Sequence, residues 1–185
     1  MTTDLTRIPL RGKDGAFHVV VESPRASTVK LKYEPELGVF TVSRPLVHGM
    51  RYPFDWGFIP STEAPDGDPL DALVYWDQST YPGVVLPCRA LGVLKVDQKK
   101  RRGGGRERND RLLVVPIIAA RAENLNSLKD LSRRERQELE HFFTAAVAFA
   151  DKDVRILGWE GVDAAERMVE EASATHEKKN AGRQK

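Results

Sequence analysis

Short strand-like segments separated by glycine and proline are the feature that most constrains how this chain folds. Segments rich in β-branched and aromatic residues recur over the first two thirds of the sequence. Strands are predicted at Phe17–Glu22, Thr28–Glu34, Val39–Arg44, Ala72–Trp76, Val84–Val96 (broken at Pro87 and Gly92) and Leu112–Ile118. Several short strands at this spacing favour a barrel or closed sheet. Residues 44–65 contain four prolines without a clear period, which predicts a long and functional connection.

Two helices are predicted after the strands. Ser132 and Glu135 have the spacing of a capping box, and apolar residues then recur at helical spacing as far as Ala150. Gly158 and Gly161 interrupt the chain, a second apolar stripe runs from Val162 to Ala172, and residues 176–185 have the composition of a frayed polar tail. The expected architecture is α+β, a β-barrel with helices appended.

Composition bounds the number of domains and the compartment. The chain has 185 residues, of which 41% are hydrophobic and 30% charged, so one domain over residues 1–185 is expected, with a core at about 16–175. No apolar run approaches the ~20 residues that cross a bilayer, and the polar N-terminus lacks the apolar region of a signal peptide. A single cysteine, Cys88, cannot form an internal disulfide. These features favour a cytoplasmic protein without membrane partners.

One basic segment dominates the charge of the chain. Residues 99–111 contain seven Lys and Arg residues and two acidic residues, which gives a local charge of +5. Because the net charge of the chain is +2, the remaining residues together carry −3. Residues 98–111 are interpreted as a basic insert, and three consecutive glycines favour a mobile hairpin tip at 99–108 over a phosphate-binding loop. Nucleic-acid binding is therefore only weakly indicated, although the insert leaves it open.

The run Asp66-Gly-Asp68-Pro-Leu-Asp71 is the strongest chemical signal. Three carboxylates within six residues repel one another unless cations or hydrogen bonds compensate their charge. A tight turn at Gly67 and Pro69 allows their oxygens to converge, and clustered hard oxygen ligands suit Mg²⁺ or Mn²⁺. From these six residues alone, a solvated Asp/Gly/Pro turn is an equally good interpretation.

Polar residues elsewhere strengthen the metal interpretation. Lys32, Glu34, Arg44 and Tyr52 lie at the ends of predicted strands and in the connection that leads to the Asp run. Alternation places Lys30, Lys32 and Glu34 on the face of their strand opposite the apolar side. Cations beside a metal–carboxylate cluster are what a phosphate substrate requires, because metals neutralise some of its oxygens and Lys or Arg bind the others.

These motifs together resemble family I soluble inorganic pyrophosphatases. The resemblance covers about residues 16–175, and its pieces occur in the family's order: Lys32-Tyr-Glu34, Arg44, Tyr52–Pro60, Asp66–Asp71 followed by Ala-Leu-Val, Gly92–Lys95, Val114–Pro116, His141–Phe143 and Gly158–Glu160. It implies a five-stranded, OB-like barrel with flanking helices and Mg²⁺-dependent hydrolysis of pyrophosphate, with Mn²⁺ as a possible substitute. It also implies a homo-oligomer, a hexamer or smaller.

The resemblance also implies roles for individual residues. Asp66 and Asp71 would bind metal, and Asp68 would be the general base for the attacking water. Lys32, Arg44 and the catalytic-centre residue Tyr52 would hold phosphate oxygens. Glu34 would bind a further metal, and Glu22 would support the site from its edge.

The chain departs from the family at several of these positions. Trp56 stands where the family has a tyrosine, and in the expanded segment Asn109 and Arg111 align with a metal-binding aspartate and a phosphate-binding lysine. Asp110 lies one residue from the position that aligns with this aspartate, and a shift of one residue in the alignment would make Asp110 the metal ligand. The remaining metal-binding aspartate is either Asp97 or Glu107.

A further departure concerns the second phosphate. The family's Tyr-Lys pair after His-Phe-Phe is Ala146-Val147 here, which removes one charge-assisted contact and one phenolic hydrogen bond. The chain is therefore predicted to hydrolyse pyrophosphate weakly or with a rewired site. Two alternatives stay open: a hydrolase for a bulkier phosphate compound that uses the vacated space, and a non-catalytic relative kept for binding.

Overall fold

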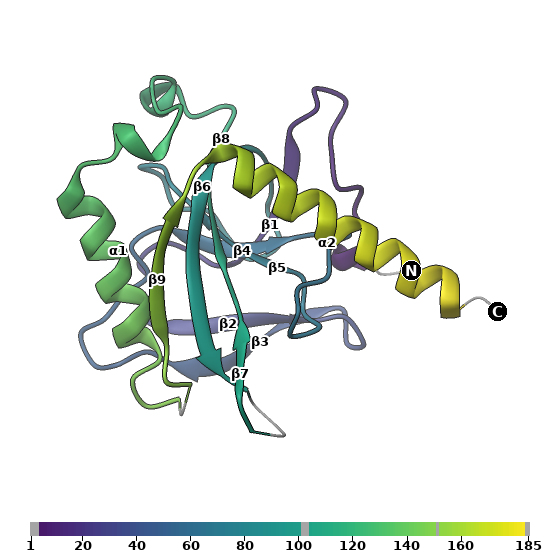
Figure 1. Cartoon of the computed structure of the whole chain (residues 1–185), viewed down its shortest axis with the longest axis horizontal. Coiled ribbons are helices and arrows are strands. Elements are labelled where there is room, and N and C mark those ends of the chain that lie inside the picture. Colours follow the sequence, from purple (N-terminus) through teal and green to yellow (C-terminus); the bar gives the residue numbers. More distant parts are fainter. Residues whose placement is uncertain (1–3, 101–103, 151, 184–185) are drawn as a thin grey trace.

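The computed structural model describes residues 4–100, 104–150 and 152–183, and its centre is a closed ring of five strands (Figure 1). The ring strands are β1 (Phe17–Ser23), β4 (Asp55–Ile59), β5 (Leu70–Val74), β8 (Arg111–Pro116) and β6 (Val85–Lys99). They pair in that order, and β6 closes the ring by pairing with β1. The β5–β8 pair is parallel and the other ring pairs are antiparallel. The expected α+β barrel with flanking helices is confirmed.

Further elements attach to the ring. Strands β7 (Arg106–Arg108) and β9 (Arg155–Glu160) pair with β6, whereas β2 (Val29–Glu34) and β3 (Val39–Pro45) form a separate two-stranded ribbon. The α-helices are α1 (Arg133–Ala146) and α2 (Val162–Arg183), and 3₁₀ turns occur at Leu5–Arg7, Ala120–Ala122 and Leu128–Asp130. Within the described ranges, no helix combines the length and apolar character needed to span a membrane.

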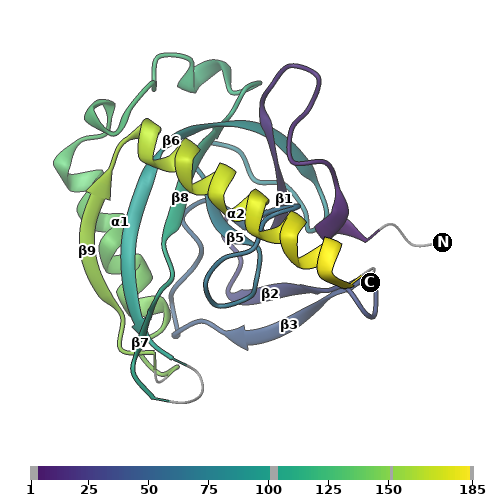
Figure 2. The ribbon, with the colours of Figure 1, turned by 45° about the vertical axis from the view of Figure 1, so that its right-hand side comes forward.

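Two hydrophobic clusters use opposite faces of the same strands. On β5, Ala72 and Val74 face the barrel interior, which Ala165 and Val169 of α2 cover (Figure 2). Leu73, between them, belongs to the cluster outside the barrel that the aromatic residues of α1 cover. Because successive side chains of a strand point to opposite faces, a ring covered on both sides needs continuous apolar runs.

The structure corrects several predicted boundaries. Strand β4 lies inside the segment expected to be a connection, and β9 crosses the glycine-containing segment expected to break the chain. Helix α1 ends at Ala146 rather than Ala150, and α2 continues through Arg183, so the expectation of a frayed tail from residue 176 is wrong up to that residue. Strand β6 is unbroken, with an irregular register between Ala90 and Gly92 in place of the predicted interruption.

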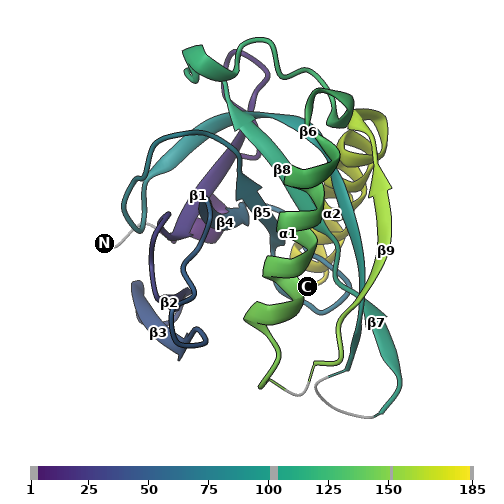
Figure 3. The same cartoon turned by 90° about the vertical axis from the view of Figure 1, so that its left-hand side faces the viewer.

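The elements that carry the predicted site residues meet at one end of the barrel. The β2–β3 ribbon, the β6–β7 hairpin and the C-terminal end of α1 all lie at this end (Figures 1 and 3). The β6–β7 pairing confirms a hairpin in the basic insert, with Lys99 opposite Arg106. Positions 101–103 of the insert, including part of its predicted mobile tip, lie outside the described residues.

Candidate active site

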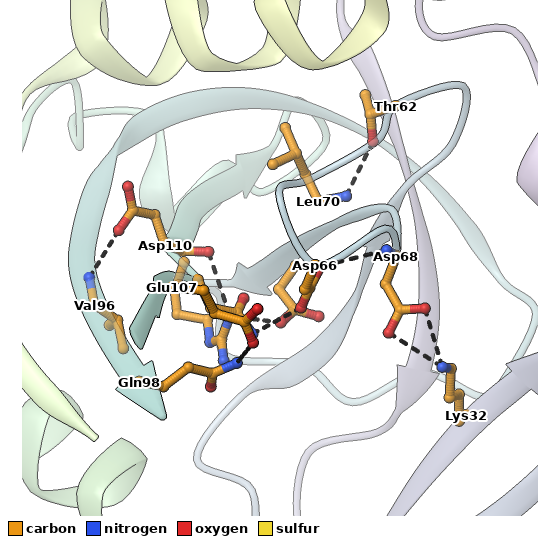
Figure 4. Close-up of polar contacts among 12 residues, drawn as sticks. Lys32, Thr62, Asp66, Asp68, Leu70, Val96, Gln98, Glu107 and Asp110 are labelled. Atoms are coloured by element: carbon orange, nitrogen blue, oxygen red, sulfur yellow. Dashed lines mark hydrogen bonds and ion pairs between the residues drawn. The ribbon is translucent and has the colours of Figure 1, made fainter. Parts of the chain in front are cut away.

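The Asp run forms a constrained loop between β4 and β5. The hydroxyl of Thr62 donates to the Ile59 carbonyl at 2.6 Å and accepts from the Leu70 amide at 3.0 Å, which fixes both ends of the loop (Figure 4). Gly67 has a φ of +85°, a conformation that favours glycine. The Asp68 amide donates to Asp66 Oδ1 at 3.3 Å. The loop therefore presents its carboxylates from a defined backbone.

Cations and an amide from three other elements meet these carboxylates. Lys32 Nζ of β2 lies 3.1 Å from Asp68 Oδ2 (Figure 4). Arg111 Nη1 of β8 lies 2.6 Å from Asp71 Oδ2. Asn109 Nδ2 donates to Asp66 Oδ2 at 3.0 Å, while its Oδ1 accepts from Arg111. The structure thus brings together six of the predicted site residues.

The charge of the cluster fits a divalent cation. Desolvation and the neighbouring charges of Asp71 and Asp68 raise the pKa of Asp66 above its usual value, whereas the charge of Arg111 lowers it. Within the described residues, no three His, Cys, Asp or Glu side chains are arranged to hold a metal ion. Arg111, Lys32 and Asn109 contact the carboxylates instead.

The β6–β7 hairpin separates the predicted metal ligands onto two faces. Gln98 pairs with Glu107 and Asp97 pairs with Arg108 in this antiparallel register. Because alternate residues share a face, Glu107 and Asn109 lie with Gln98 on one face, and Asp97 and Asp110 belong to the other. Asn109 contacts Asp66, which identifies its face as the inner one.

Asp97 and Asp110 make their contacts away from the Asp cluster. Asp97 pairs with Arg106, which also reaches Asp153. Asp110 accepts from the Val96 amide at 2.8 Å and pairs with Arg108 at 2.7 Å, at the wall of a pocket of about 280 Å³ beside α2. Their prediction as metal ligands therefore has no support from this geometry.

Gln98 and Glu107 lie on the inner face instead. Gln98 is 2% exposed, and its Nε2 donates to Glu107 Oε1 at 3.1 Å (Figure 4). Its Oε1 has no hydrogen-bond partner in the described part of the chain. An unpaired buried oxygen is costly, so this amide is an oxygen donor still available to a cation.

The remaining predicted residues surround the cluster. Glu22 is 6% exposed and accepts from the Tyr33 amide at 2.8 Å, and burial raises its pKa to about 7. Glu34 lies near Lys32. Burial lowers the pKa of Lys32, but the carboxylates of Asp68, Glu34 and Glu22 raise it, and the net shift is upward. Lys32 therefore stays positively charged at neutral pH.

Arg44 and Tyr52 lie beside the C-terminal end of α1. Arg44 Nη1 donates to the Ala146 carbonyl at 2.5 Å, where a helix leaves its last carbonyls unpaired. Tyr52 is 5% exposed, and burial raises its pKa to about 12 although Arg44 and Ser23 lower it. Its hydroxyl is therefore a hydrogen-bond donor at any physiological pH.

The space around Ala146 is filled. Ala146 is 7% exposed and belongs to an aromatic cluster with Tyr52, Trp56, Phe142 and Phe143. The Trp56 ring lies 5.6 Å from that of Phe143 and 6.3 Å from that of Tyr52. The side chain of Ala146 is therefore packed within the outer hydrophobic cluster.

Sequence reasoning did not assign roles to Lys30, Gln98 and Lys152. For Lys30 the signal was present, because it alternates with Lys32 on one face of β2. Gln98 and Lys152 carried no local signal, since their position depends on the hairpin register and on the connection between α1 and β9.

Comparisons with known proteins identify the family of this chain. A family model described as "Inorganic pyrophosphatase" matches residues 19–177. An inorganic pyrophosphatase of Synechocystis is 38% identical over 168 residues, which cover 91% of this chain and 96% of that protein. One of Methanosarcina acetivorans is 36% identical over 162 residues, with 88% and 93% covered.

Solved structures give the same result. The crystal structure of the inorganic pyrophosphatase from Thermus thermophilus superposes with a TM-score of 0.85 at 35% identity and covers 95% of this chain and 99% of that chain. A pyrophosphatase structure from Coxiella burnetii gives a TM-score of 0.81 at 35% identity, with 91% of this chain and 99% of that chain covered. The chain belongs to the inorganic pyrophosphatase family.

Proposed function

We propose that this protein hydrolyses inorganic pyrophosphate to two phosphates with Mg²⁺ as its metal ion. The observation that carries the proposal is the meeting of Asp66, Asp68 and Asp71 with Lys32 and Arg111 at one end of the barrel. Carboxylates of this kind hold a hard cation, and the cations beside them bind phosphate oxygens. Family membership supports the same reaction.

The metal ligands follow from the inner face of the hairpin. We assign them to Asp66, Asp71 and Glu107, with amide oxygens from Asn109 and Gln98. A cation bound there would neutralise phosphate charge and lower the pKa of the attacking water. This ligand set replaces Asp97 by Glu107, the alternative that shares a face with Asn109.

Asp68 is the proposed general base. Its side chain is 58% exposed, so water reaches it, and it is held by Lys32. The water oxygen bonds to one phosphorus, its proton goes to Asp68, and the bond to the bridging oxygen breaks to release the second phosphate. Lys32, Arg44 and the Tyr52 hydroxyl bind phosphate oxygens during this step.

Phosphate release from pyrophosphate tests the proposal. With Mg²⁺, the wild-type protein is expected to release phosphate from pyrophosphate faster than from tripolyphosphate or nucleotides, and Mn²⁺ is expected to substitute for Mg²⁺. Asp68→Asn should lower kcat by about 10²-fold while preserving most metal binding. Asp14→Asn, an isosteric change in a remote turn, is the matched control and should match the wild type. Absence of metal-dependent phosphate release by the wild type would refute the proposed reaction.

Two wider expectations belong to the same proposal. We infer a homo-oligomer, to be measured by light scattering coupled to gel filtration, and a cytoplasmic location. Cys88 is fully buried and burial raises its pKa, which suits a structural thiol in a reducing compartment.

Three arginines of residues 98–111 are committed to ion pairs. Arg106 pairs with Asp97 and Asp153, Arg108 pairs with Asp110, and Arg111 is committed to Asp71. Paired guanidinium groups contribute little to the counterion release that drives binding to nucleic acid.

A further inference from the structure

A buried indole N–H without a partner lies beside the cluster described above. Trp56 is 4% exposed, yet its Nε1 has no hydrogen-bond partner in the described part of the chain. Buried indole nitrogens are usually hydrogen-bonded, because an unpaired donor loses its interaction with water and gains nothing in return. This donor is therefore available to an acceptor that the protein itself does not provide.

Cations gather around the same indole. Arg111 Cζ lies 5.4 Å and Lys30 Nζ 5.8 Å from the centre of the Trp56 ring. Lys30 also pairs across the β2–β3 ribbon with Arg44, which places two like charges opposite each other. Like charges in this position destabilise a ribbon unless an anion lies between or beside them.

Lys152 brings a further cation from the connection between α1 and β9. Its carbonyl accepts from the Lys99 amide at 2.7 Å, which holds this connection against the end of β6. Burial lowers the pKa of Lys152 and the charges of Lys30 and Arg111 lower it further, while the charges of Asp71 and Asp66 partly offset this shift. Among the described residues, neither Lys30 nor Lys152 forms an ion pair.

The charge balance around the Trp56 indole differs from that of the Asp cluster. Lys32 is paired with Asp68 and Arg111 with Asp71. Lys30 and Lys152 are partly buried and form no ion pair among the described residues, although the charge of Glu22 acts on Lys30 and the charges of Asp71 and Asp66 act on Lys152. Positive charge that is partly withdrawn from water without a directly bonded counterion is costly, and an oxyanion would supply both the charge and an acceptor for the indole N–H.

We propose that Lys30, Lys152 and the Trp56 N–H form a phosphate-binding subsite beside Arg111 and Arg44. This inference rests on the proposed function and assigns residues to one end of its substrate. The subsite supplies charge and a hydrogen bond from residues other than Ala146 and Val147, the positions at which this chain lacks the family's Tyr-Lys pair. In this chain, therefore, the second phosphate is held by β2, β4 and the α1–β9 connection.

Binding of inorganic phosphate tests the subsite without relying on turnover. Calorimetric titration with phosphate in the presence of Mg²⁺ is expected to give a Kd about tenfold higher for Lys152→Gln and for Lys30→Gln than for the wild type. Trp56→Phe, which keeps an aromatic ring but removes the N–H donor, should weaken phosphate binding severalfold. Lys152→Arg retains the charge and should stay within about threefold of the wild type. Lys129→Gln, at an exposed lysine outside the site, is the matched control.

Pyrophosphate kinetics give a second measurement. Lys152→Gln should raise KM by about tenfold and change kcat by less than threefold, as expected when a binding contact remote from the attacked phosphorus is lost. Far-UV circular dichroism and the melting temperature of each variant identify any variant that fails to fold. If Lys152→Gln fails to fold, the phosphate affinity of Lys152→Arg tests whether a positive charge at this position is sufficient.

The outcomes separate this inference from the proposed function. Phosphate affinity in Lys30→Gln, Lys152→Gln and Trp56→Phe equal to that of Lys129→Gln would overturn the subsite, even if the wild type hydrolyses pyrophosphate. If the wild type binds phosphate but does not hydrolyse pyrophosphate, the proposed reaction fails while the loss of affinity in these variants still supports the subsite.

Discussion

Glu22 shows how burial at a single residue links the site to the stability of the fold. The residue is 6% exposed, and burial raises the pKa of its carboxyl from 4.5 to about 7 despite the hydrogen bond from Tyr33 and the charge of Lys30. The folded state therefore binds this proton more tightly than the unfolded state. The stability contributed by the protonated group is complete below pH 4.5 and is lost as pH rises through about 7.

Replacing Glu22 by Gln should remove this pH dependence. Glu22→Gln keeps an oxygen that accepts from the Tyr33 amide but carries no charge, so we expect a higher free energy of unfolding than the wild type at pH 8. The difference should be at most about 3 kcal/mol and should shrink towards pH 5. Urea unfolding at both pH values in EDTA measures it, with Glu36→Gln, at an exposed turn, as control. Equal pH slopes in wild type and Glu22→Gln would contradict the prediction.

Individual site residues were predictable to the extent that their placement is local. Asp66, Asp68 and Asp71 lie in one turn, so their convergence followed from six adjacent residues. Lys32 lies on the polar face that alternation predicts for its strand. Asp97 and Glu107 could not be separated from sequence, because a shift of one residue in the hairpin register exchanges the two faces. The residues of the proposed phosphate-binding subsite come from three distant segments of the sequence, so no local sequence pattern connects them.

At the scale of elements, prediction succeeded where one face of the element is polar. Strand β2 alternates, and the capping box of α1 is present, with the Ser132 hydroxyl accepting from the Glu135 amide at 3.1 Å. Strand β4 is buried along its whole length and therefore has no alternation, and prolines surround it. The last turns of α2 lack an apolar stripe, because they extend beyond the barrel interior that the first turns cover (Figure 2).

The β6–β7 hairpin is expected to act through its paired strands rather than through its tip. Replacing residues 100–105 by Asn-Gly would join the facing residues Lys99 and Arg106 by the turn that two-residue hairpins favour. This variant should retain the fold and bind Mn²⁺ as tightly as the wild type. Glu107→Gln in the intact hairpin should weaken Mn²⁺ binding by about tenfold, because a charged oxygen ligand becomes neutral.

The matched control for Glu107 is Asp97→Asn, which makes the corresponding change on the outer face. Free Mn²⁺ measured by electron paramagnetic resonance gives the affinity of each variant without turnover. Stronger loss in Asp97→Asn than in Glu107→Gln would place the cation on the outer face and reverse the assignment made from the register.

At the scale of the whole molecule, β6 connects every layer of the structure. It spans Val85–Lys99 and pairs with β1, β7, β8 and β9. Its residues contribute to the barrel interior, covered by α2, and to the outer cluster, covered by α1. Because the two clusters use side chains of the same strands, we expect the two layers to unfold as one cooperative unit.

This architecture predicts a single unfolding transition, and the tryptophans allow each layer to be followed separately. Trp76 packs against the interior cluster, whereas Trp159 belongs to the outer cluster and donates from Nε1 to Glu140 of α1 at 2.6 Å. Two variants each retain one of these tryptophans and have the other tryptophans changed to Phe. In each variant, the urea midpoint measured by fluorescence should equal the midpoint measured by far-UV circular dichroism. Calorimetric and van't Hoff enthalpies should also agree for the wild type. A Trp159 transition that precedes the loss of strand signal would mean that the α1 layer unfolds by itself, and the single domain proposed for residues 1–185 would then consist of two units.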